Sequence, residues 1–121
     1  MGEIATSDRQ ITIYYCTNSV RAKQAFAYAK SEGLAIQPID ILKTPLTGTQ
    51  IAEFANRLGI EVKDLINQEH PAFSKKFERV ELSSEDWIKM IKQNPEIMKQ
   101  PIALRGDQII LVETPSDMIK I

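Results

Sequence analysis

The first part of the chain follows a strand pattern and then a helix pattern. Ile11–Tyr15 reads ITIYY, β-branched and aromatic throughout, which predicts a buried strand. The polar segment after it ends at Ser19, a residue type that caps helices. Residues 20–32 are Ala-rich and predict a helix with one apolar stripe formed by Ala22, Phe26 and Ala29.

A second strand pattern follows this helix. Gly33 is placed to end the helix, because glycine favours the position just past a helix C-terminus. Leu34–Ile41 reads LAIQPIDI and predicts a strand. Pro38 places it at an edge of the sheet, because proline has no N–H to donate. A strand, a helix and a strand in this order form a right-handed parallel unit.

The middle of the chain has helical periodicity. Thr47 and Gln50 have the spacing of a capping box. Apolar residues then follow at helical intervals up to Gly59 (Ile51, Phe54, Ala55 and Leu58). Residues 62–67 predict a short helical turn. Ser83 or Ser84 caps another amphipathic helix, which carries Trp87 inward and stops before Asn94-Pro95.

The end of the chain predicts a β-hairpin and a helix. Residues 101–105 and 108–112 form the two arms around Gly106-Asp107. Thr114 then caps a last helix with Pro115 at its first position. The whole pattern predicts an α/β domain with one mixed four-stranded sheet, flanking helices and a helical insert.

Composition and charge narrow the class of protein. The chain has 121 residues, 43% of them hydrophobic, which suits one soluble domain over residues 11–121 after a disordered tail at 1–10. The net charge of −1 and the lack of a nucleic-acid motif argue against direct nucleic-acid binding. The first ten residues lack the apolar core of a signal peptide, and no apolar run is long enough for a membrane span. Cys16 is the only cysteine, so no disulfide can form within the chain. We expect a cytoplasmic monomer.

Several short motifs resemble the arsenate reductase (ArsC)/Spx family of thioredoxin-fold proteins. They occur in the family's order and spacing over nearly the whole chain after the first ten residues (residues 11–14, 40–46, 58–59, 64–67, 82–83 and 94–102). The resemblance implies a thioredoxin-like, glutaredoxin-like fold.

Two residues depart from the family pattern. In the family a cysteine follows the tyrosine of the first strand by five positions, and counting from Tyr14 leads to Ser19. The family also has an arginine directly before the proline that begins the third strand. Here Gln100 precedes Pro101, and Lys99 lies one residue too early. A one-residue shift on a strand turns a side chain to the opposite face.

These departures bear directly on the chemistry. Arsenate reduction, as the family performs it, needs a thiolate that attacks arsenic and a sulfur that glutathione can then release. A serine hydroxyl has no comparable ionisation or redox chemistry. Neutral Gln100 cannot replace the charged fork that arginine offers an oxyanion. We therefore expect that arsenate reductase activity is lost.

Part of the site's scaffold survives in the sequence. The N-terminus of the first helix at Ser19, with Arg21 and Lys23 in its first turn, could still hold an anion weakly. The alternative is that Ser19 is only a helix cap and that both cations are solvated. By resemblance, Pro101 is the cis proline beside the site.

Cys16 offers a different chemistry. Cys16 and Ser19 have the C-x-x-S spacing of monothiol glutaredoxins, although Cys16 is only two residues past Tyr14. A thiol oxidoreductase that forms a mixed disulfide with glutathione is one possibility. A buried, inert cysteine is the other.

The sequence thus predicts a catalytically silent relative that needs no cofactor or metal. Its implied role, by analogy with Spx, is to bind a protein partner such as RNA polymerase. The runner-up is the thiol oxidoreductase that uses Cys16, with glutathione as co-substrate.

Overall fold

The computed structural model describes residues 9–17, 19–67 and 82–121, which divide into two compact units. Among the described residues, the first unit consists of those from Arg9 to Thr44 together with Gln100–Ile121. The second consists of Pro45–Lys99.

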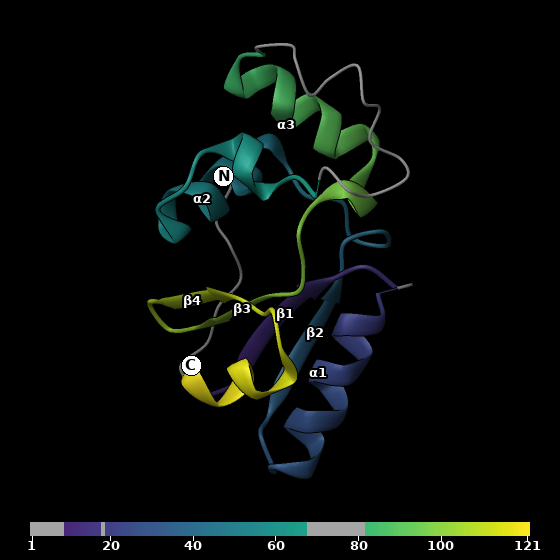
Figure 1. Cartoon of the computed structure of the whole chain (residues 1–121), viewed down its shortest axis with the longest axis vertical. Coiled ribbons are helices and arrows are strands. Elements are labelled where there is room, and N and C mark those ends of the chain that lie inside the picture. The colour runs from purple at the N-terminus through teal and green to yellow at the C-terminus, as the bar shows by residue number, and fades with distance from the viewer. Residues whose placement is uncertain (1–8, 18, 68–81) are drawn as a thin grey trace. The chain divides into compact units, whose positions relative to one another are not determined.

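The first unit contains the predicted mixed sheet (Figure 1). Its strands are β1 (Ile11–Tyr15), β2 (Ile36–Asp40), β3 (Ile102–Arg105) and β4 (Gln108–Leu111), in the order β2-β1-β3-β4. Strand β1 is parallel to β2 and antiparallel to β3, and β3 and β4 form the hairpin. Strand β1 lies between β2 and β3, and its first four residues are buried, as its β-branched and aromatic composition predicts.

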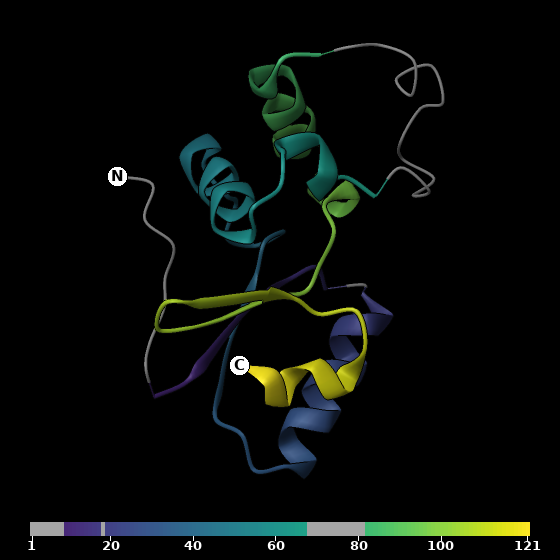
Figure 2. The ribbon, with the colours of Figure 1, turned by 60° about the vertical axis from the view of Figure 1, so that its left-hand side comes forward.

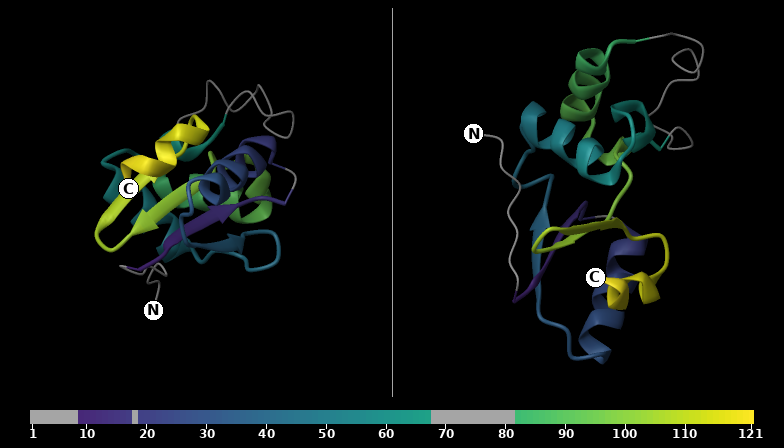
Figure 3. Two further views of the ribbon diagram at one scale, coloured as in Figure 1. Left: turned by 90° about the horizontal axis from the view of Figure 1, so that it is seen from below. Right: turned by 90° about the vertical axis from the view of Figure 1, so that its left-hand side faces the viewer.

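Helix α1 (Val20–Ser31) and the 3₁₀-helix η4 (Pro115–Lys120) cover one face of this sheet (Figures 2 and 3). A buried core fills the space between these layers (Ile11, Ile13, Ala25, Ala29, Ala103, Val112 and Met118). At its margin the rings of Tyr15 and Phe26 meet edge to face, with centroids 4.8 Å apart.

The predicted edge position of β2 is confirmed, with Pro38 in the outermost strand. The strand begins at Ile36, however, and not at Leu34 as predicted. The reason is the end of α1. Gly33 takes the left-handed conformation (φ 69°), and the Leu34 N–H donates to the carbonyl of Ala29 at 2.9 Å. Leu34 therefore belongs to the helix cap.

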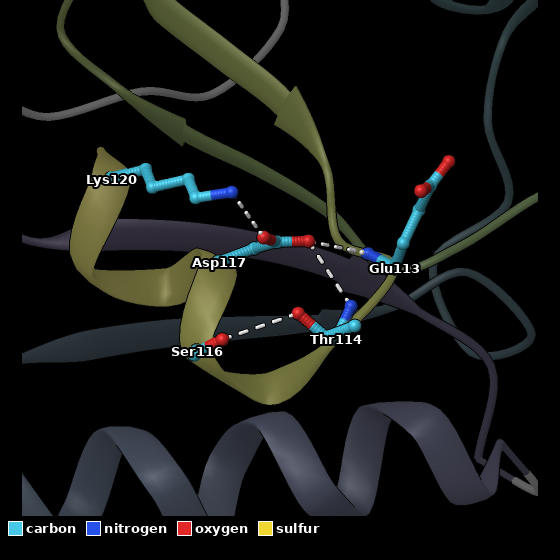
Figure 4. A network of polar contacts seen from close by, with 5 residues as sticks. All are labelled: Glu113, Thr114, Ser116, Asp117 and Lys120. Carbon is cyan, nitrogen blue, oxygen red and sulfur yellow. Dashed lines mark hydrogen bonds and ion pairs between the residues drawn. The ribbon is translucent and has the colours of Figure 1, made fainter.

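One other prediction of the first unit needs correction, and one is confirmed. The buried stripe of α1 consists of three alanines (Ala22, Ala25 and Ala29), and Phe26 is only half-buried. The predicted last helix is confirmed, with Thr114 at the N-cap position and Pro115 first, and it is a 3₁₀-helix of six residues. The Asp117 carboxylate accepts hydrogen bonds from the backbone N–H groups of Glu113 and Thr114 and pairs with Lys120 (Figure 4).

The second unit is helical in its described part. Helix α2 (Gly48–Leu58) begins with the predicted Thr47–Gln50 capping box, and the 3₁₀-helix η1 (Val62–Leu65) follows. Ser83 caps α3 (Ser84–Gln93), and η3 (Pro95–Ile97) comes next. Six large apolar side chains of these elements are buried (Ile51, Phe54, Leu65, Trp87, Ile91 and Ile97). An antiparallel bridge joins Ile66 to Met98.

The predicted tail at residues 1–10 lies outside the described residues except for Arg9 and Gln10, which are exposed. No described helix has the length and apolar character that a membrane span requires.

Candidate functional site

The candidate site lies in the first unit, where β1 ends and α1 begins. Cys16 directly follows β1 and is only 3% exposed. Three residues further along, the backbone N–H of Ser19 donates to the carbonyl of Cys16 at 3.0 Å.

Ser19 is the N-cap of α1, as the sequence predicts. Its backbone is extended (φ −76°, ψ 117°), and its Oγ accepts the N–H of Ala22 at 3.0 Å. The Ser19 carbonyl also accepts the N–H of Lys23 at 3.2 Å, which starts the helical ladder. The hydroxyl oxygen therefore satisfies a backbone donor that the helix itself leaves unpaired.

Gln100 lies beside this loop although it is 84 residues from Cys16 in the sequence. The Cys16 N–H donates to Gln100 Oε1 at 2.8 Å. The Gln100–Pro101 peptide bond is cis, as the resemblance implies for the proline of the site. Pro101 is buried, and its carbonyl accepts the N–H of Val112 at 2.9 Å.

The two predicted cations lie on the surface of α1. Arg21 and Lys23 occupy its first turn, and both are exposed. The structure thus brings Cys16, Ser19, Gln100 and Pro101 together. The side chains of Arg21 and Lys23 are exposed to solvent, and anion binding at the N-terminus of α1 stays a prediction.

Sequence reasoning missed one polar contact at this end of the sheet. The Thr17 hydroxyl donates to Asp40 Oδ2, which ties the loop after β1 to the end of β2. Asp40 Oδ1 also accepts the Leu42 N–H at 3.0 Å. Partial burial by itself would raise the pKa of Asp40, but the Thr17 and Leu42 hydrogen bonds and the charge of Lys43 together lower it. An aspartate that ends a strand before a turn is the signal that could have indicated this contact.

The chemistry that these groups can support is limited. The oxygen atoms of Ser19 and Gln100 both accept backbone N–H groups, and the cysteine is buried. The described part of the chain contains no group of His, Cys, Asp and Glu side chains that could hold a metal ion.

Comparison with solved structures places this architecture among known folds. An arsenate reductase from Vibrio cholerae superposes with a TM-score of 0.83 over 95% of this chain and 99% of its own, at 18% identity. The chain has the thioredoxin-like fold. A protein related to arsenate reductase (ArsC) from Brucella melitensis gives 0.69 at 16% identity, over 96% of this chain and 97% of its own.

A Staphylococcus aureus protein is similar at 24% identity, with a TM-score of 0.65 over 90% of this chain and 97% of its own. No protein-family model matches the chain, and no curated protein does. At these identities the likeness establishes the fold, and the function has to be argued from the residues of the site.

Proposed function

We propose that this protein is a diverged relative of the arsenate reductases that does not reduce arsenate and acts by binding a protein partner. The observation that carries the proposal is the position of Ser19. Where a thioredoxin-fold reductase of this family has its thiol, this chain has a hydroxyl whose oxygen caps α1. A hydroxyl cannot form the sulfur–arsenic bond or the mixed disulfide that the reduction requires.

The surroundings of Ser19 support the same conclusion. The Gln100 side chain is neutral, and its oxygen accepts the Cys16 N–H. An amide at this point supplies no positive charge to an arsenate oxyanion. The thiol of Cys16 belongs to a residue that is 3% exposed, so it does not meet glutathione or arsenate in the folded protein.

Exposed apolar side chains near the site support a binding role. Val20, the first residue of α1, is 66% exposed, and Leu42, just after β2, is 41% exposed. Because β1 and β2 are parallel, their carboxyl ends lie at one edge of the sheet, and the Thr17–Asp40 hydrogen bond joins the two loops there. Val20 and Leu42 are therefore the exposed aliphatic side chains that a partner bound at this edge would cover.

The catalytic half of the proposal is tested by an arsenate reduction assay supplied with glutathione and glutaredoxin. We expect the wild-type protein to show no turnover above the protein-free background. The Ser19→Cys/Gln100→Arg double variant should gain measurable turnover, because it restores a thiol at the helix N-terminus and a cation beside it. Ser19→Cys alone is the intermediate control. A double variant that folds but stays inactive would show that these two positions do not explain the lack of arsenate reduction.

Turnover by the wild-type protein would instead favour the alternative thiol oxidoreductase. In that reaction the Cys16 thiolate and a glutathione thiolate each displace a hydroxide from arsenate, and release of arsenite then passes two electrons to arsenic and leaves the Cys16–glutathione mixed disulfide, which glutaredoxin and glutathione reduce. The Cys16→Ser variant decides this point, since it would abolish such turnover completely.

The binding half is tested with purified bacterial RNA polymerase, the partner that the resemblance to Spx suggests. Val20→Ser and Leu42→Ser should weaken binding measured by titration calorimetry. Ile119→Ser is the matched control, because Ile119 is 59% exposed and lies on η4. If the wild-type protein does not bind, RNA polymerase is excluded as the partner.

A further inference from the structure

The hydrogen bond between Cys16 and Gln100 stands at a specific point of the sheet. In the β1–β3 ladder Thr12 is opposite Leu104 and Tyr14 is opposite Ile102. Continued by two residues, this antiparallel register places Cys16 opposite Gln100. There the Cys16 N–H donates to the side-chain Oε1 of Gln100.

Both backbone polar groups of Cys16 form hydrogen bonds. The N–H donates to Gln100 at 2.8 Å, and the carbonyl accepts the N–H of Ser19 at 3.0 Å. Ser19 in turn caps α1 through Ala22. One continuous chain of hydrogen bonds therefore runs from the start of β3, through the loop, to the first turn of the helix.

The residue type at position 100 matters because the Cys16 N–H is buried. A buried backbone donor without an acceptor is strongly disfavoured, and a side-chain amide oxygen fulfils this need. Glutamate also offers an acceptor at the same reach. Methionine and arginine do not, since a thioether is a weak acceptor and a guanidinium only donates.

We infer that Gln100 is a positioning residue that holds Cys16, and through it Ser19, at the start of β3 and so keeps the thiol of Cys16 inside the core. At the position where the family pattern has a cation for the substrate, this chain has an amide oxygen that accepts a backbone N–H. Access to the chain's single thiol is thus controlled by a side chain 84 residues away.

The bond can be detected directly in the wild-type protein. A long-range NMR experiment that transfers magnetisation across hydrogen bonds should connect the Cys16 amide nitrogen with the side-chain carbonyl carbon of Gln100. The same spectrum contains the β1–β3 backbone hydrogen bonds as positive controls. Backbone cross-peaks without the Cys16–Gln100 peak would overturn the inference.

Substitution tests the consequence for the thiol. In Gln100→Met we expect the Cys16 amide to exchange with deuterium, and the thiol to react with iodoacetamide, on the order of tenfold faster than in the wild type. Gln100→Glu should restore both rates, because it keeps the acceptor. Gln24→Met is the matched control, since Gln24 is an exposed residue of α1. Unchanged rates in a folded Gln100→Met variant would contradict the role of Gln100.

These outcomes are separable from those of the proposed function. The inference uses that proposal only to say what position 100 holds in the family. Arsenate turnover by the wild-type protein would reject the proposed function and leave the Cys16–Gln100 bond in place. A spectrum without the Cys16–Gln100 cross-peak would reject the positioning role of Gln100 and leave the result of the arsenate assay unchanged.

Discussion

At the scale of single residues, this protein uses polar side chains to complete its backbone. Ser19 and Gln100 are the two examples at the candidate site. Each one supplies an oxygen to a backbone N–H, from Ala22 and from Cys16. Because a cap or an acceptor needs only a lone pair, serine and glutamine suit these positions.

The cap role of Ser19 predicts a stability effect. Ser19→Ala should lower the free energy of unfolding by about 1 kcal/mol, because the Ala22 N–H loses its acceptor. Urea denaturation followed by circular dichroism measures this difference. Ser84→Ala is the control, as Ser84 is exposed and already inside α3. Equal effects at the two serines would argue against a specific cap.

At the scale of elements, helix ends are where the sequence and the structure agree best. Capping boxes, prolines and glycines stand where local geometry demands them, and the predicted boundaries at Thr47, Gly59 and Ser83 are confirmed. These signals act within one turn of backbone, so no distant residue is needed to place them.

Gly59 allows the left-handed cap of α2 to be tested by itself. Its φ is 72°, and a Cβ placed there would meet no atom within 4 Å. Gly59→Ala should therefore cost about 1 kcal/mol of stability from backbone conformation alone. Gly59→Asn should cost less, because asparagine tolerates this conformation. Equal losses measured by urea denaturation would contradict the conformational explanation.

The cap of η4 predicts a dependence on pH. Hydrogen bonds from Lys120 and from the backbone N–H groups of Thr114 and Glu113 hold the pKa of Asp117 well below its ordinary value of 3.8. The folded state thus prefers the carboxylate. Its stabilising contribution is complete above the ordinary pKa and declines as the pH falls below it.

We therefore expect Asp117→Asn to reduce the free energy of unfolding more at about pH 7 than at about pH 3. Urea denaturation at both pH values measures the difference. Asp107→Asn, at an exposed aspartate in the hairpin turn, is the control. A loss that is the same at both pH values would show that the charge of Asp117 does not stabilise η4.

At the scale of the molecule, the last residues complete a core that the first strand begins. Met118 of η4 is fully buried together with Ile11 and Ile13 of β1 and Ala25 and Ala29 of α1. The alanines leave room for a larger side chain, and the methionine from the far end of the chain supplies it. The first unit is therefore assembled from both ends of the sequence.

Met118→Ala should cost 2–5 kcal/mol, roughly the range for a large-to-small change in a core. Ile119→Ala is a matched control, since the neighbouring side chain is 59% exposed. Urea denaturation compares the two variants. A loss at Ile119 as large as that at Met118 would contradict the orientation of η4.

The sequence by itself determined the elements of this protein and most of their ends. Five β-branched and aromatic residues predict β1, Pro38 places β2 at an edge, and Ser19 starts α1, because each of these effects is local or depends on hydrophobic periodicity. The sequence also named the members of the candidate site through resemblance. It could not show what those residues contact.

Only the tertiary structure decided that Gln100 accepts the N–H of Cys16 and that Cys16 is buried. It also decided that Thr17 donates a hydrogen bond to Asp40, and that Met118 shares one buried core with Ala25 and Ala29. Such pairs join residues that are far apart in the chain, so no short-range pattern encodes them. They form because strand register and close packing leave one place for each side chain.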